Sequence, residues 1–474
     1  MGSQRCNKVA TSSLIVHTTM VVTRLRAAAS GALESVHVAH LLKGWRSHHA
    51  LRCPMSAISI VFGSNNTVTA APGLLWTHAG QACAAQWRSE RGAPPPKKVV
   101  VADDTITADA AYRLACEGTA LLWQGDFQNA RQLLQAMARR VDQPAKRTHR
   151  KQSAKVAIAA QTPSTDPSQS AFNLHRQAQA QRARVLGMVL IPFNADYGIA
   201  LRRAPDARQA CAEAWGKADA TGGVSVASLR ELLGLISAHE WRKNGVEIPA
   251  LGLAPNNRIH PHYGVFSPVR GEYITLVAST LRTAAGSNAN AISQKYSLAF
   301  DIGTGTGVLA AVMVRSGIPR VIATDQDPRA LVCARDNLTQ LGVIEQVQVV
   351  QANLFPEGLA PLIVCNPPWL PARPSSPVEH AVYDEGSRML LGFLSGLVAH
   401  LAPQGEGWLI LSDLAEHLGL RSRGELLTAI ETAGLRVVGR LDAKPIHPKA
   451  QDSTDPLHTA RAAEVTSLWR LAAK

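Results

Sequence analysis

After Ala291 the sequence alternates short apolar runs with segments of helical periodicity, and this alternation restricts the fold more than any other feature. Five runs have the length and composition of buried strands, at residues 296–302, 320–324, 347–351, 362–365 and 407–412. Helical patterns lie between them, at residues 307–316, 327–341 and 388–401. Such alternation predicts an α/β domain with a mostly parallel sheet and helices on both faces. Two later runs, at residues 435–441 and 464–471, are expected to close the sheet with an antiparallel edge.

A chain of 474 residues is too long for one ordinary domain, so the α/β domain is expected to occupy only residues 258–474. Residues 99–257 are predicted to form a mainly helical accessory region, possessing helices at 107–123, 129–140, 171–190 and 229–241. Within it, residues 142–170 are first basic and then rich in Ser, Thr, Pro and Gln. That composition predicts a disordered linker.

Positive charge is concentrated in the first third of the chain. Residues 1–160 hold 20 Lys and Arg against 8 Asp and Glu, whereas the whole chain has a formal net charge of +14. Residues 1–98 are predicted to be a poorly structured basic leader. Its first 54 residues resemble a transit peptide in composition, but a start site placed too early, with Met55 or a later codon as the true start, explains them better. A basic appendage favours attraction to nucleic acid, and a merely solvated leader is the alternative.

Several classes of protein are excluded by composition. No run of 18 apolar residues is present, so we expect neither a membrane span nor a membrane partner. The seven cysteines are scattered without a C-x-x-C pair or a Cys/His cluster. This argues against a metal site and a secreted disulfide framework, and it favours a reducing cytoplasm.

A glycine-rich turn follows the first strand of the α/β domain. It reads Asp301-Ile-Gly303-Thr-Gly305-Thr-Gly307, with glycines at every second position. Glycines there let the backbone approach a ligand closely. A dinucleotide fingerprint needs a small residue three positions after its second glycine, where this chain has Val308. The turn therefore favours a nucleotide-like cofactor other than a dinucleotide.

Two polar residues at later strand ends agree with that interpretation. Asp325 lies 24 residues after Asp301, at the end of the second strand. A carboxylate in that place can accept hydrogen bonds from both hydroxyls of a ribose, and a cap for the helix at 327–341 is the alternative. Asn353 follows the third strand, where it is expected to contact an adenine ring.

The fourth strand ends in Asn366-Pro367-Pro368-Trp369, 65 residues after Asp301. Two prolines stiffen this turn and fix the Asn366 side chain and the Pro367 carbonyl at the sheet edge. Two acceptors held there can take both hydrogens of a planar amino group, which directs the nitrogen lone pair outward. Trp369 offers a flat face for stacking. The pattern predicts transfer of a methyl group to nitrogen, a reaction that depends on orientation more than on a strong base.

The turn of Asp301–Gly307, Asp325 and Asn366–Trp369 together resemble the class I S-adenosylmethionine-dependent methyltransferases of the small-domain type. These include the ribosomal RNA guanine-N2 and adenine-N6 methyltransferases and the release-factor glutamine methyltransferases. The resemblance implies a Rossmann-like, seven-stranded catalytic domain. It also implies that Asp301 and the glycines hold the methionine part of S-adenosylmethionine, Asp325 the ribose, and Asn366 with Pro367 the target nitrogen.

Two flanking segments leave the acceptor open. Residues 263–272 resemble the RNA enzymes through Gly264-Val-Phe266, whereas residues 383–390 resemble a loop of the glutamine enzymes. The basic first third, and a helix carrying Arg176, Arg182 and Arg184, favour a base in ribosomal RNA as acceptor. A protein amide is the alternative, and a non-catalytic RNA-binding protein is a third. Asn at position 353, where these families often have Asp, and Trp at position 369, where Tyr or Phe is commoner, depart from the pattern.

Overall fold

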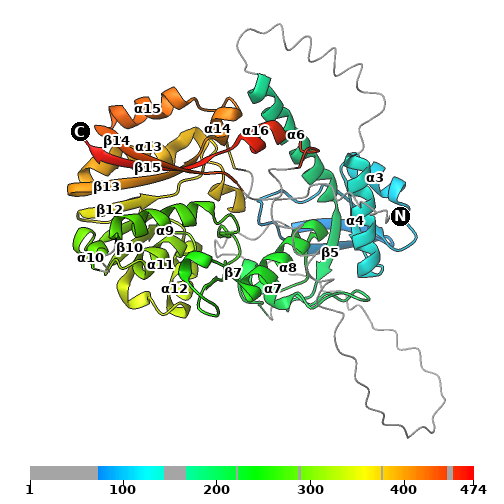
Figure 1. Cartoon of the computed structure of the whole chain (residues 1–474). Helices are drawn as coiled ribbons and strands as arrows, with labels where there is room; N and C mark the ends of the chain where they lie inside the picture. The colour runs from blue at the N-terminus through cyan, green and yellow to red at the C-terminus, as the bar shows by residue number, and fades with distance from the viewer. Residues whose placement is uncertain (1–72, 143–166, 220–221, 287–289, 375–376, 446–451) are drawn as a thin grey trace, which may run out of the picture. The chain divides into compact units, whose positions relative to one another are not determined.

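The structure, a computed structural model, describes residues 73–142, 167–219, 222–286, 290–374, 377–445 and 452–474 (Figure 1). All of them lie in one compact unit, Pro72–Lys474. The expectations for residues 1–54, and for residues 143–166 of the expected linker, lie outside the described residues. Two large sheets organise the described part, one of six strands from its first half and one of seven strands from its second half.

The C-terminal sheet is the α/β sheet expected from the sequence. Its strand order is β11-β10-β9-β12-β13-β15-β14. The pairs from β11 to β13 are parallel, and β15 runs antiparallel to both of its neighbours. The strands are β9 (Ala299–Ile302), β10 (Val321–Asp325), β11 (Val347–Gln351), β12 (Ala360–Cys365), β13 (Leu401–Ser412), β14 (Leu435–Ala443) and β15 (Thr466–Ala473).

Helices cover both faces of this sheet because side chains alternate between the faces along each central strand. Along β12, Leu362 and Val364 join the core cluster that contains residues of α9 (Glu272–Ala285), α11 (Val308–Arg315) and α12 (Pro328–Gln340). Ile363 and Cys365 join the opposite cluster, with residues of α13 (Arg388–His400) and α15 (Arg423–Thr432). The central strands are thus buried on both sides, as in other parallel sheets.

The prediction of a mainly helical accessory region left out a sheet. Its helices α3 (Ala108–Cys116), α4 (Phe127–Asp142), α6 (Pro167–Leu186), α7 (Arg208–Trp215) and α8 (Leu229–Asn244) accompany a mixed six-stranded sheet of order β1-β2-β6-β5-β4-β3. The helix expected at 107–123 ends early because Gly118 adopts a positive φ of 83°, and β4 (Thr119–Trp123) follows it. In the same way β5 (Val189–Phe193) follows α6. A five-residue apolar run does not distinguish a strand from a helix end by its periodicity.

The boundary of the expected leader at residue 98 also needs correction. β1 (Gly73–His78) and β2 (Gln81–Trp87) form a hairpin, and β3 begins at Lys98 (Lys98–Ala102). The hairpin turn consists of Ala79 and Gly80, both with positive φ. It lacks the Asn-Gly or Asp-Gly pair from which such turns are usually predicted. β2 then pairs with β6 (Ser225–Ser228), which lies far along the sequence, so local pattern does not indicate the pairing.

Candidate active site

The site lies where the order of the C-terminal sheet changes direction. β9 is flanked by β10 on one side and by β12 on the other, and both pairs are parallel. Ile302, the last residue of β9, pairs with Thr324 of β10 and with Cys365 of β12. The residues that follow, Gly303, Asp325 and Asn366, therefore leave the sheet side by side at its carboxyl edge. Open α/β sheets bind their ligands at such a switch point.

The glycine-rich turn connects β9 to α11 and is shaped for close approach of a ligand. Gly303, Gly305 and Gly307 have φ of 72°, 55° and 80°, a conformation that favours glycine. A Cβ on Gly303 would come within 2.5 Å of Met389 Cε, the flexible end of that side chain, so the positive φ favours glycine there more than packing does. No other atom lies within 4 Å of a Cβ built on Gly305, so open space adjoins the backbone at that point.

Asp301 is almost completely buried beneath this turn, with 1% of its surface exposed. The Thr304 hydroxyl donates to its Oδ2 (2.6 Å), and so does the Ala310 amide (3.1 Å). Burial raises the pKa of the Asp301 carboxyl to about 6, the two hydrogen bonds oppose the rise, and the nearby charge of Asp325 adds to it. The carboxylate thus ties the turn to α11 and places negative charge under the candidate cofactor site.

Asp325 holds the other side of the turn. Its Oδ2 accepts a hydrogen bond from the Gly305 amide (3.0 Å), and its Oδ1 accepts one from the Asp327 amide (3.0 Å). The N-cap of α12 is Asp327, whose side chain accepts from the Arg329 amide, so the cap alternative for Asp325 is wrong. Burial raises the pKa of Asp325, and the backbone hydrogen bonds partly offset this. Each carboxylate oxygen retains capacity for a further donor.

The Asn366–Trp369 turn follows β12 directly. The Trp369 indole N–H donates to Asn366 Oδ1 over 2.9 Å, which fixes the amide group. The indole is half-buried and packs against the core clusters on both faces of the sheet, so it supports the turn as well as offering a flat face. An amide oxygen has two lone pairs, and Asn366 Oδ1 can accept a further hydrogen bond. Asn353 is exposed in the loop after β11, at the same edge of the sheet.

Four residues around the site were not predicted as site residues. Asp384 is buried and accepts hydrogen bonds from the amides of Met389 (2.8 Å) and Leu390 (3.3 Å). These backbone amides at the start of α13 thereby have hydrogen-bond partners. Thr304 binds Asp301, and Arg421 donates to the Trp369 carbonyl over 3.5 Å. For Asp384 and Met389 the only signal was the resemblance of residues 383–390. Nothing in the sequence indicated Thr304 or Arg421, since their partners are known only from the fold.

The arginines of α6 do not form the free phosphate-binding face that was expected. Arg182 is 5% exposed and makes a bidentate ion pair with Asp142. Its Nε donates to Oδ1 over 2.6 Å and its Nη2 to Oδ2 over 2.9 Å. Arg176 donates to the backbone carbonyl of Arg373. Of the three arginines, Arg184 alone is exposed, and it donates to Gln181 on the same helix. Most of the charge on this helix therefore serves the fold.

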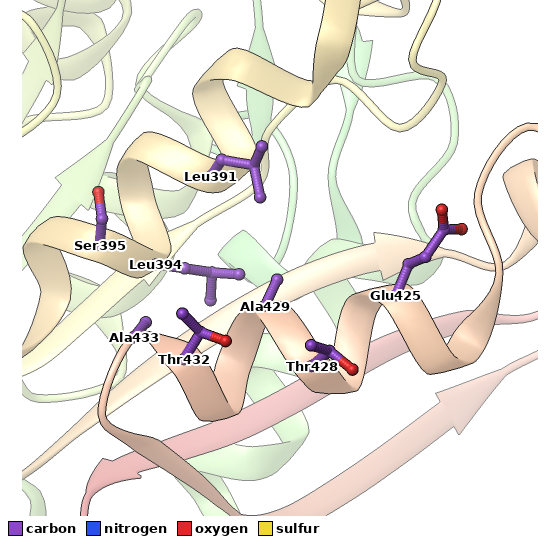
Figure 2. A pocket seen from close by; sticks show the side chains of 8 residues that line it. All are labelled: Leu391, Leu394, Ser395, Glu425, Thr428, Ala429, Thr432 and Ala433. Carbon is purple, nitrogen blue, oxygen red and sulfur yellow. The ribbon is translucent and has the colours of Figure 1, made fainter.

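Other features of the described residues lie away from this site. A groove of ≈ 510 Å³ runs between α13 and α15 and is lined by Leu391, Leu394, Ala429 and Ala433, among others (Figure 2). None of the predicted site residues lines it. Within the described ranges no group of three or more His, Cys, Asp or Glu is placed to hold a metal ion. No helix in the same ranges is long and apolar enough to cross a membrane.

Known proteins resemble the part of the chain that contains this site. Residues 287–367 match the family described as "Ribosomal protein L11 methyltransferase (PrmA)". The ribosomal protein L11 methyltransferase of Pelotomaculum thermopropionicum is 33% identical over 145 residues, which are 30% of this chain and 39% of that protein. The protein of the same name from Vibrio cholerae is 35% identical over 92 residues, 19% of this chain and 31% of that one. The chain thus spans less than half the length of these curated relatives.

Among solved structures, the chain is similar to "Crystal structure of Methyltransferase from Pyrococcus furiosus". It is 18% identical, has a TM-score of 0.34, and covers 51% of this chain and 99% of its own. The matched segment, residues 287–367, contains the glycine-rich turn, Asp325 and Asn366, and the family and sequence relatives that match it are methyltransferases by name. The narrower resemblance to the small-domain enzymes stays a prediction.

The hydrogen bond between Trp369 and Asn366 can be tested by Trp369→Phe. Phenylalanine keeps a flat ring but has no N–H, so the Asn366 amide loses the donor that orients it. We expect the rate of methyl transfer to fall about 5- to 10-fold, which corresponds to one neutral hydrogen bond of about 1 kcal/mol. Cofactor affinity, measured by calorimetry, should stay within about twofold. An unchanged rate would show that Asn366 is oriented without Trp369.

Burial of Asp301 predicts an unusual dependence of stability on pH. The folded state binds its proton more tightly than the unfolded state, whose pKa is near 3.8. This group therefore lowers stability as the pH rises from about 4 to about 6, by up to about 3 kcal/mol. Asp301→Asn should raise the free energy of unfolding at pH 7.5, because no charge is buried, and should have little effect near pH 4. Urea titrations at both pH values measure this, and equal destabilisation at both would contradict it.

Proposed function

We propose that the chain is an S-adenosylmethionine-dependent N-methyltransferase whose acceptor is a nitrogen of a protein of the translation machinery. The observation that carries the proposal is the register at the switch point. It brings the glycine turn, Asp325 and the Asn366–Trp369 turn to one edge of the sheet. The choice of a protein acceptor is supported by the curated relatives, which are named for methylating a ribosomal protein. This reverses the order of preference reached from the sequence, where an RNA base came first.

The residues at this edge fit the cofactor. Open space beside Gly305 allows a ligand to lie against the turn backbone. Asp325 has lone pairs left for ribose hydroxyls after its two backbone contacts. Asp301 places a negative charge beneath the turn, on the side proposed for the methionine part. Asn353 is proposed to contact the adenine ring. S-adenosylmethionine, when bound, supplies a methyl group that is activated by its attachment to a positively charged sulfur.

The chain's own contribution to the reaction is orientation of the acceptor. Asn366 Oδ1 and the Pro367 carbonyl accept the hydrogens of the acceptor nitrogen, so that its lone pair is directed toward the methyl group. Pro367 and Pro368 restrict the turn, and the Trp369 indole holds the Asn366 amide. Holding reactants in a productive geometry contributes a large part of catalysis in such reactions. No side chain in this scheme has to act as a strong base.

A base in RNA remains the second candidate. It is supported by the basic composition of residues 1–160 and by the resemblance of Gly264-Val-Phe266 to the RNA enzymes. Against it, two of the three arginines on α6 are engaged within the protein. The third candidate, a non-catalytic RNA-binding protein, is the least supported, because the turn, the acids and Asn366 are all present.

The acceptor can be identified by incubating the whole chain with methyl-labelled S-adenosylmethionine and a lysate of cells that lack the gene. The products are then treated with RNase or with protease, and the Asn366→Ala variant serves as the background. Label destroyed by protease supports the proposal. Label destroyed by RNase would replace it with the RNA candidate, and the absence of label above background would favour the non-catalytic alternative.

A further inference from the structure

Helix α6 of the accessory region reaches the loop that follows the candidate acceptor turn. Its Phe172 is 3% exposed and lies in a separate apolar cluster of the described residues. The other buried members of that cluster are Leu370, Leu414, Ala415, Leu418 and Leu457. Leu370 is the residue directly after Trp369. One end of α6 is therefore anchored beside the acceptor turn.

Arg176 lies one helical turn after Phe172. It makes three contacts with the same loop, the segment between β12 and α13. Its Nη2 donates to the Arg373 carbonyl over 2.7 Å. Its guanidinium carbon lies 4.3 Å from the centre of the Tyr383 ring, which is a cation–π distance. The carboxylate of Glu379 lies 3.8 Å from the same Nη2. A planar guanidinium can donate in its plane and stack on its face at once, which a lysine cannot do.

Backbone hydrogen bonds connect the part of the loop that Arg176 contacts to the acceptor turn. The Leu370 amide donates to the Val382 carbonyl (3.1 Å), and the Asp384 amide donates to the Leu370 carbonyl (2.9 Å). These two bonds bracket Tyr383, which forms an isolated bridge with Leu370. Asp384 in turn accepts from the Met389 amide at the start of α13. The position of Tyr383 therefore affects the position of Leu370, the residue next to Trp369.

Regular backbone structure contributes little to the position of this loop, which apart from Arg176 depends on the Leu370 cluster and on Arg421. Between β12 and α13 its described part contains only two short 3-10 helices, Pro377–Ala381 and Glu385–Ser387, and the bridge at Leu370. Segments with few backbone ladders open at low free energy and depend on side-chain contacts for their position. Arg176 supplies such contacts from a different part of the chain.

We propose that Arg176 is a positioning residue for methyl transfer: by holding the Tyr383 loop it keeps the Asn366–Trp369 turn in its productive geometry. The accessory region then contributes to the rate of the reaction as well as to any recognition of the acceptor. This inference rests on the proposed function. The stabilisation of the loop by Arg176 can, however, be measured without any acceptor.

Arg176→Ala is the first test, with Arg184→Ala as its matched control on the same helix. Arg184 is exposed and donates its hydrogen bonds to Gln181, on α6 itself. We expect Arg176→Ala to lower kcat about 10- to 100-fold, as a small misplacement of reacting groups does. Cofactor affinity and the KM for the acceptor should change by no more than a few-fold. Arg176→Lys should fall between the variant and the wild type, and Arg184→Ala should match the wild type.

Hydrogen exchange followed by mass spectrometry provides the readout that is independent of activity. Peptides covering residues 370–387 should exchange faster in Arg176→Ala than in the wild type, while peptides of the six-stranded sheet should not. Tyr383→Leu removes the partner of the stacking contact from the other side. If Arg176 acts through Tyr383, the double variant should lose little more activity than either single variant.

The outcomes separate the two proposals. Unchanged exchange in the loop, or faster exchange with an unchanged kcat, would overturn the positioning role of Arg176. An equal loss in Arg184→Ala would also overturn it, since that result indicates a general effect on the helix. A wild-type protein that binds the cofactor but methylates no acceptor would remove the proposed function, and the exchange rates would still decide whether Arg176 holds the loop.

Discussion

Asn366→Ala is expected to lower the rate of methyl transfer by about 10²–10³-fold, the size found when one preorganised polar group is removed from an active site. Alanine removes the side-chain acceptor of the acceptor amine and also leaves the Trp369 N–H without its partner. The hydrogen bonds of Asp301, Gly305 and Asp325 go to groups other than this side chain, so cofactor affinity should stay within a few-fold. Single-turnover rates with labelled cofactor, together with calorimetric Kd values, measure both quantities.

A loss of cofactor binding in Asn366→Ala would contradict this division of roles. It would mean that Asn366 belongs to the cofactor site, or that the turn supports the glycine loop. Retention of the full rate would also contradict the proposed role of Asn366, because the Pro367 carbonyl would then suffice to orient the acceptor. Trp369→Phe provides the graded comparison, with an effect that should be smaller than that of Asn366→Ala.

Asp325→Ala is expected to weaken S-adenosylmethionine binding about 10- to 100-fold, with little effect on the rate at saturating cofactor. The variant loses the proposed ribose contact and also the Gly305 amide contact that holds the glycine turn. Loss of hydrogen bonds to a charged group costs about 1–3 kcal/mol, and 1.4 kcal/mol corresponds to a factor of ten in Kd. Calorimetric titration measures the change directly.

Asp327→Ala is the matched control for Asp325→Ala. Asp327 lies two residues further on, is exposed, and caps α12 through the Arg329 amide. Its loss should lower stability by about 1 kcal/mol, as for other N-caps, without changing cofactor affinity by more than a few-fold. A wild-type affinity in Asp325→Ala would show that this carboxylate serves only the backbone at the edge of β10.

The C-terminal domain could be predicted from the sequence because its signals are local. The central strands are short apolar runs with a polar residue at or next to their carboxyl ends, and the predicted helices have a periodicity of their own. The spacing of Asp301, Asp325 and Asn366 at three strand ends already indicated one edge of a parallel sheet. The register at Ile302 confirms that these ends are neighbours.

The accessory region shows where local signals fail. β4 and β5 are short apolar runs directly after helices, and the breaks at Gly118 and Gly187 are the only sequence cues to their starts. β2 and β6 pair across more than a hundred residues, and no periodicity reveals such a pairing. The stacking of Arg176 on Tyr383 joins residues still further apart in the sequence, so charge on α6 suggested a nucleic-acid face when it mainly serves the fold.

The positions of individual site contacts were likewise beyond the sequence. That Asp325 binds the Gly305 amide while Asp327 caps α12 depends on how the two acids leave β10. That Trp369 fixes Asn366 depends on the path of a proline-restricted turn. In both cases the residue type was predicted to matter, but its physical partner came from the structure.

The central claim, a cofactor site for S-adenosylmethionine at the carboxyl edge of β9 and β10, is tested most directly by calorimetric titration of the whole chain. S-adenosylmethionine should bind with one site per chain, and Asp325→Ala should weaken it at least about tenfold. NAD, titrated in parallel as the competing nucleotide cofactor, should give no binding heat. Binding of NAD, or the absence of any binding of S-adenosylmethionine, would contradict the account.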